Sequence, residues 1–132
     1  MATLHDLQVW LALEHEAVWL YGLIGAREET LAKPARTSYD AHRVARDRLR
    51  AVVHDLGAQP VGPALTYGDA VDSPSSARSA ASDVERRISA ACLTLFGHAG
   101  RDGRGLAMTG LRRAALAGLD WGADVRAFPG LD

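Results

Sequence analysis

A fifteen-residue segment without helical periodicity, residues 58–72, divides the chain into two halves. Each half contains two amphipathic stretches joined by a short link, which is typical of an antiparallel helical hairpin. The dividing segment contains Pro60 and Pro63 and spans up to about 50 Å when extended. A helix of about 20 residues is only about 30 Å long. The segment can therefore run from one end of a hairpin to the other.

Helix start and stop signals set the expected boundaries within one domain, residues 1–132. We expect helices over about residues 3–31, 37–56, 74–96 and 105–126. Pro34 follows the first helix, Gly57 suits the end of the second, and Ser73 with Pro74 suits the start of the third. Two antiparallel hairpins joined by a long crossover predict an all-α, ferritin-like four-helix bundle.

Composition excludes several classes of protein. Hydrophobic residues make up 48% of the chain and charged residues 23%, which disfavours disorder. A net charge of -1 disfavours nucleic-acid binding, and the single Cys92 cannot form an internal disulfide. No secretory signal is recognisable, and Glu14 and Glu16 interrupt the most apolar run, so we expect a cytoplasmic protein that does not span a membrane.

An acidic residue, Glu14, lies at the centre of the apolar stripe of the first expected helix. By helical phase His42 lies within the apolar face of the second, and Glu85 lies at the edge of that of the third. A carboxylate inside a bundle is costly unless it is paired or bound to metal. One interpretation is therefore a degenerate carboxylate–histidine site for iron or manganese, formed by Glu14, His42 and Glu85.

The favoured interpretation is a buried polar network without a cofactor, in which Glu14 pairs with Arg46 or Arg112. The Glu-x-x-His pattern of di-metal bundles is missing, since the second expected helix offers Tyr39-x-x-His42 instead. Folding the first hairpin about residue 33 also places Glu14 and His42 about 15 Å apart along the axis, too far to share a metal. A third possibility is a small-molecule site lined by Trp10, Tyr21 and Glu14.

Helical phase also predicts which surfaces of two helices are buried. In the fourth expected helix Arg112 lies at the edge of the predicted core face, which consists of Met108, Leu111, Ala115, Gly118, Leu119 and Gly122. In the first, Trp19 and Leu23 lie away from the core stripe. Exposed apolar residues at such positions predict contact with a partner, most simply a homodimer in which this helix packs against its copy.

The order and spacing of several short segments resemble an uncharacterised family of alanine-rich bacterial proteins, of actinobacterial type, with a ferritin-like fold. These segments are residues 11–22, His42-Arg43, Arg46-Asp47, residues 57–60 and residues 127–131. The resemblance covers essentially the whole chain and implies a dimeric four-helix bundle with no established biochemical activity. It does not imply ferroxidase activity, because the chain departs from the di-iron ligand pattern, and fold alone does not define function. We therefore expect a structural or interaction role, with metal-dependent oxidoreductase or metal-binding activity as the alternative.

Overall fold

The computed structural model describes residues 2–122, which contain four α-helices, one short 3-10 helix and no strand. The helices are α1 (Ala2–Arg27), η1 (Glu29–Leu31), α2 (Ala32–Asp55), α3 (Pro74–His98) and α4 (Arg101–Asp120). The expected all-α class is confirmed. No helix within residues 2–122 is long and apolar enough to cross a bilayer.

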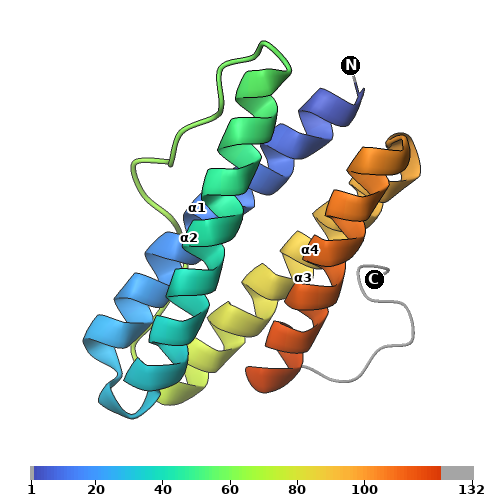
Figure 1. Cartoon of the computed structure of the whole chain (residues 1–132). Helices are drawn as coiled ribbons and strands as arrows, with labels where there is room; N and C mark the ends of the chain where they lie inside the picture. The colour runs from blue at the N-terminus through green and yellow to red at the C-terminus, as the bar shows by residue number, and fades with distance from the viewer. Residues whose placement is uncertain (1, 123–132) are drawn as a thin grey trace.

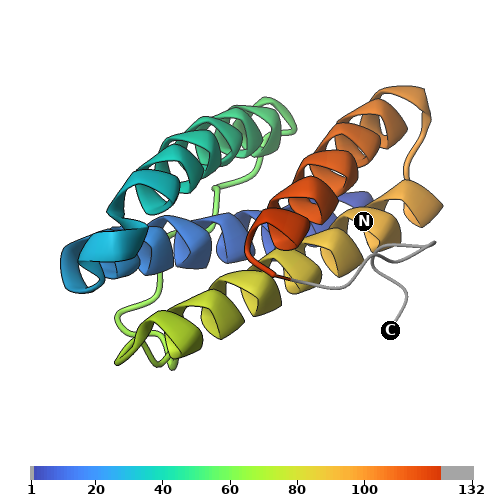
Figure 2. The same cartoon turned by 90° about the horizontal axis from the view of Figure 1, so that it is seen from below.

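The helices form two antiparallel hairpins, α1 with α2 and α3 with α4 (Figure 1). Figure 2 shows α1 and α3 side by side in one layer, with α2 on α1 and α4 on α3. Large apolar side chains that are almost fully buried fill the space between the layers: Trp10, Leu11, Leu20, Tyr21, Ile24, Leu49, Val53, Val84, Ile88 and Leu95. Helix α1 is thus the central element, because it packs on both α2 and α3.

The segment between α2 and α3 runs along α1 from its beginning to its end (Figure 1). At one end the side chain of Gln8 donates to the carbonyl of Gln59 at 2.8 Å, and at the other Arg27 donates to the carbonyl of Val71 at 3.2 Å. Between them the rings of Trp19 and Tyr67 lie 5.2 Å apart. We call residues 58–72 the crossover, because α3 consequently begins at the opposite end of the bundle from the end of α2.

The first hairpin turns earlier than the sequence predicted. Helix α1 ends at Arg27 rather than near residue 31, and α2 begins at Ala32 rather than near residue 37. Pro34 therefore lies within the first turn of α2 instead of between the helices. A proline is tolerated there because the first amide groups of a helix have no intrahelical acceptor to lose.

Helix α4 also begins earlier than predicted, at Arg101 instead of near residue 105. The glycines that indicated a loop lie inside the helix, and one has a packing reason. A Cβ atom on Gly103 would lie 2.6 Å from the Cβ of Ala99, so the tight link before α4 excludes a larger residue. The described part of α4 ends at Asp120, and the predicted end near residue 126 lies outside the described residues.

Helix α4 buries a face rotated from the predicted one, although Gly118 is buried as predicted and Leu111 packs against the core. The buried positions are small, namely Ala107, Gly110, Ala114 and Gly118, whereas the larger Met108 and Leu119 are exposed. At Gly110 an added Cβ would collide with the indole of Trp10 and lie 2.8 Å from Sγ of Cys92. Close approach of the α4 backbone to Trp10 therefore selects the small face for burial, and the aliphatic face points outward.

Candidate functional site

Three polar side chains predicted to face the core meet at the centre of the bundle. Glu14 comes from α1, His42 from α2 and Glu85 from α3, and all three are buried, with Glu85 only 1% exposed. Each replaces one residue in an otherwise apolar helix face, so packing of the three helices brings them together. Burial of this kind requires each polar atom to find a partner.

The imidazole of His42 lies between the two carboxylates. Its Nδ1 is 2.5 Å from Oε1 of Glu14, and its Nε2 is 2.8 Å from Oε2 of Glu85. A neutral imidazole has a single N–H, so donating to both carboxylates requires the protonated ring. Burial is the largest single influence and opposes this charge, but attraction and hydrogen bonds from Glu14 and then Glu85 together outweigh it and raise the pKa of His42 to about 10.

Two aromatic side chains of α1 complete the network. The indole Nε1 of Trp10 donates to Oε2 of Glu14 at 2.8 Å, and the hydroxyl of Tyr21 donates to Oε2 of Glu85 at 2.5 Å. Burial raises the pKa of Tyr21, and the charge of Glu85 raises it further, so the phenol stays a donor. The Tyr21 ring also stacks on His42, with ring centres 5.3 Å apart.

The network extends to the end of α4 through an aromatic contact. The ring of Trp121 lies 5.5 Å from that of Tyr21, and its Nε1 donates to Oγ of Ser38 at 3.1 Å. Trp121, which directly follows α4, thus contacts Tyr21 of α1 and Ser38 of α2. One oxygen of this network is not hydrogen-bonded: Oε1 of Glu85 is buried and has no hydrogen-bond partner among the described residues.

The arginines predicted to pair with Glu14 lie elsewhere. Arg46 donates to Oδ1 of Asp47 at 3.0 Å, and Arg112 lines a surface groove. The expected axial separation of about 15 Å between Glu14 and His42 is wrong, because the hairpin turns around residue 28 rather than 33. Glu14 and His42 are equally distant from residue 28 in sequence, which places them level with each other.

The geometry of this network differs from that of a metal centre. Glu14 and Glu85 direct oxygens to opposite nitrogens of one ring, rather than toward a common point. Within residues 2–122 no group of three or more His, Cys, Asp or Glu side chains is arranged to hold a metal ion. Trp10 and Tyr21, considered as walls of a small-molecule site, are about 1% exposed and fill the core themselves.

Sequence analysis missed a second charged cluster, which fixes the crossover to the bundle. Arg87 of α3 lies 2.6 Å from Glu16 of α1, 2.9 Å from Asp83 and 3.8 Å from Asp69 of the crossover. The hydrogen bond from Arg87 lowers the pKa of Glu16, whereas burial and then the adjacent Glu16 raise the pKa of Asp69 to about 6. Because the crossover has no periodicity, its sequence did not indicate where Asp69 would lie.

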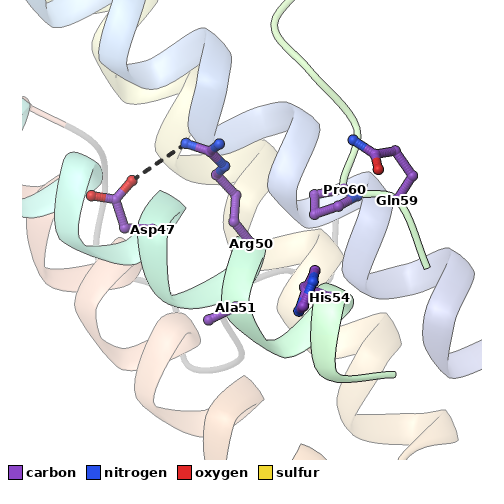
Figure 3. A pocket seen from close by; sticks show the side chains of 6 residues that line it. All are labelled: Asp47, Arg50, Ala51, His54, Gln59 and Pro60. Atoms are coloured by element: carbon purple, nitrogen blue, oxygen red, sulfur yellow. Dashed lines mark ion pairs between the residues drawn. The ribbon is translucent and has the colours of Figure 1, made fainter. Parts of the chain in front are cut away.

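A polar depression lies where α2 ends and the crossover begins (Figure 3). Its volume is about 530 Å³, and it is lined by Asp47, Arg50, Ala51, His54, Gln59 and Pro60. Arg50 lies 4.0 Å from Asp47, and the side chains of both are more than half exposed. Such charges are well solvated, so this depression has the character of ordinary polar surface.

The fold and its centre define a class of protein: an all-helical chain of two hairpins with a histidine held between two buried carboxylates. The chain matches the family model described as "Domain of unknown function (DUF4439)" over residues 6–132 and therefore belongs to that family. It is similar to the crystal structure of a conserved hypothetical protein from Mycobacterium tuberculosis, with a TM-score of 0.85 and 24% sequence identity over 96% of this chain and 95% of that one. These matches support the resemblance to an uncharacterised family of actinobacterial type. No functionally curated protein matches the chain.

Proposed function

We propose that this protein is a ferritin-like bundle that acts as a structural or interaction module, with an imidazolium where such bundles hold metal. The ferritin-like assignment is supported by the two antiparallel hairpins and the crossover that joins them. The observation that carries the proposal is the placement of His42, whose two ring nitrogens face Glu14 and Glu85 at 2.5 and 2.8 Å.

The physical argument concerns charge in the core. Two carboxylates inside a helical bundle repel each other and need a cation between them. The His42 imidazolium supplies this positive charge from within the chain. Trp10 donates to the second oxygen of Glu14, and Tyr21 donates to the Glu85 oxygen that also faces His42. The imidazolium offsets one of the two negative charges, and the hydrogen bonds from Trp10 and Tyr21 stabilise the charge that remains. The role of this core is then to define the packing of the helices.

The alternative function, metal binding or metal-dependent oxidation, is favoured by one observation. Oε1 of Glu85 is buried without a partner among the described residues, and an unpartnered carboxylate oxygen is a ligand for iron or manganese. Elemental analysis of protein purified without chelator separates the two functions. We expect substoichiometric iron and manganese and a thermal midpoint that neither metal changes. Stoichiometric metal that is lost in Glu14→Ala and retained in the surface control Asp47→Ala would overturn the proposal.

We also propose that the module is a homodimer that uses the outward face of α1. Support comes from Trp19, which is 37% exposed although it packs against Tyr67, and from the half-buried Leu23 beside it. Sedimentation equilibrium of the wild type should give a dimer, and Trp19→Glu should give a monomer. Val44→Glu, an equally drastic change on α2, should stay dimeric. A monomeric wild type, or a dimer unaffected by Trp19→Glu, would refute this interface.

A further inference from the structure

Helices α2 and α4 stand apart on one side of the bundle (Figure 2). Residues of both helices line a groove between them. α1 packs on α2 and α3, and α3 packs on α4, but α2 and α4 make little direct contact. The groove has a volume of about 530 Å³ and is lined by Thr37, Ser38, Ala41, Thr109, Arg112, Arg113, Leu116, Ala117 and Asp120. Both walls are therefore regular helices, and the groove runs between them.

Aliphatic side chains border the groove although they could have been buried. Helix α4 buries its small residues and exposes Leu116, which lines the groove, by 58%. On α2, Val44 is 66% exposed and continues the helical stripe of the groove residues Thr37 and Ala41. Clustered exposed aliphatic residues on two facing helices mark an interaction surface more often than a solvated one.

The same two helices carry the positive charge of the molecule. Helix α2 has six Lys and Arg against three Asp, and α4 has four Arg against two Asp, in a chain whose net charge is -1. Arg112 and Arg113 line the groove, and Arg48 extends the stripe of Val44 by one helical turn. The groove thus combines the apolar Ala41, Leu116 and Ala117 with hydroxyl groups, two arginines and one acidic residue, Asp120.

We propose that this groove binds an acidic amphipathic helix of a partner protein. Such a helix would place apolar residues at i, i+3, i+4 and i+7 against Leu116 and Val44 and its acidic residues against Arg112, Arg113 and Arg48. This deepens the proposed interaction role, but it uses a different face from that of Trp19. The two proposals therefore fail independently, since one concerns self-association and the other a second protein.

A second copy of the chain does not offer the required helix. The acidic residues of α1 are engaged within their own molecule: Glu14 with His42, Glu16 with Arg87 and Asp6 with His98 at 2.6 Å. In α3, Asp83 is bound by Arg87 and Glu85 is buried. Helices α2 and α4 are net basic, so the acidic helix is assigned to a different protein.

The experiment measures fluorescence anisotropy of a labelled helical peptide of about 18 residues with leucines on one face and glutamates on the other. We expect saturable binding by the wild type and binding weaker by about tenfold or more for Arg112→Glu, Arg113→Glu and Leu116→Asp. Arg43→Glu is the matched control, because Arg43 lies over the Tyr39 ring on the other side of α2, and it should bind like the wild type. Circular dichroism confirms that each variant is folded.

Two control peptides and one lipid vesicle distinguish the proposal from its alternatives. A scrambled peptide of the same composition tests charge attraction alone, and a version with lysines in place of glutamates tests the charge sign. Both should bind at least about tenfold more weakly. Equal binding of the scrambled peptide overturns the proposal. So does Arg112-dependent binding to vesicles of phosphatidylglycerol in the absence of peptide binding, because it would identify a lipid surface as the occupant.

Discussion

Nε2 of His42 and Oε2 of Glu85 lie 2.8 Å apart across the diagonal of the bundle, joining α2 of one hairpin to α3 of the other. Neighbouring helices share extensive packing as well as charged contacts such as Glu14 with His42, whereas this diagonal pair is joined by the charged contact alone. Apolar side chains tolerate small rotations of the helices, but a hydrogen-bonded ion pair has a narrow range of geometry. The contact therefore fixes how the two hairpins face each other.

Removal of the imidazole should destabilise the fold strongly. His42→Ala leaves Glu14 and Glu85 buried without their shared cation, and breaking a buried ion pair in this way costs about 3–5 kcal/mol. Urea unfolding measures the loss. His54→Ala, at a site whose side chain is 81% exposed, should change the free energy of unfolding by less than about 0.5 kcal/mol. Equal stability of both variants would show that the network contributes nothing.

Stability should fall with rising pH on the alkaline side of neutrality. The pKa of His42 is raised from 6.5 to about 10 in the fold, so the folded state binds the proton more tightly than the unfolded chain does. This contribution is fully present below pH 6.5 and is lost as pH rises toward 10, and it is on the order of a few kcal/mol. Urea midpoints across this interval test it. In His42→Gln the decline should flatten, and an unchanged slope would refute the assignment.

The contribution of Asp69, in the crossover, to the stability of the fold should depend on pH. Because the pKa of Asp69 is raised to about 6, its neutral form favours the fold, and this contribution is lost as pH rises from the unfolded value of 3.8 through 6. Asp69→Asn keeps a neutral side chain of the same shape. We expect it to raise the thermal midpoint most at about pH 8, less at about pH 5 and scarcely at all below pH 3.8. A lower midpoint at pH 8 would show that the ion pair with Arg87 dominates.

Two glycines of α4 should give opposite results when changed to alanine. Gly110→Ala forces a Cβ into Trp10 and Cys92 and should cost about 1–3 kcal/mol through overpacking. Gly105→Ala meets nothing within 4 Å and should stabilise the helix by about 0.5–1 kcal/mol. Thermal unfolding of both variants compares them directly. A tolerated Gly110→Ala would contradict the close approach of α4 to Trp10.

The helical class and the polar side chains at the core could be predicted from periodicity, because Glu14 and His42 each interrupt an apolar stripe. Their contact could not be predicted, since it depends on where the hairpin turns. A shift of the turn from residue 33 to residue 28 moves α2 by several residues relative to α1. Pro34 indicated a boundary that the first turn of a helix does not require.

The face that α4 buries could not be predicted for a different reason. Hydrophobicity favours burial of Met108 and Leu119. The hydrophobic pattern of a single helix contains no information about the side chains that will pack against it. The neighbour is Trp10, whose indole occupies the space that larger α4 side chains would need. The choice of partner for Glu14 was wrong in the same way, because His42 was discounted on a register that the tertiary fold does not have.

The path of the crossover has a consequence for how the molecule opens. Helix α1 packs on α2, on α3 and against the crossover, whereas α4 packs extensively on α3 and meets α1 mainly at Trp10 within the described chain. Local unfolding begins in the element that has the fewest contacts with neighbouring elements to break. Main-chain amide protons of α1 should therefore exchange with deuterium only through global unfolding. Those of α4 should exchange through a partial unfolding that has a lower free energy. Of the two helices that line the groove, α4 is then the one that can move away from the rest of the bundle as a unit.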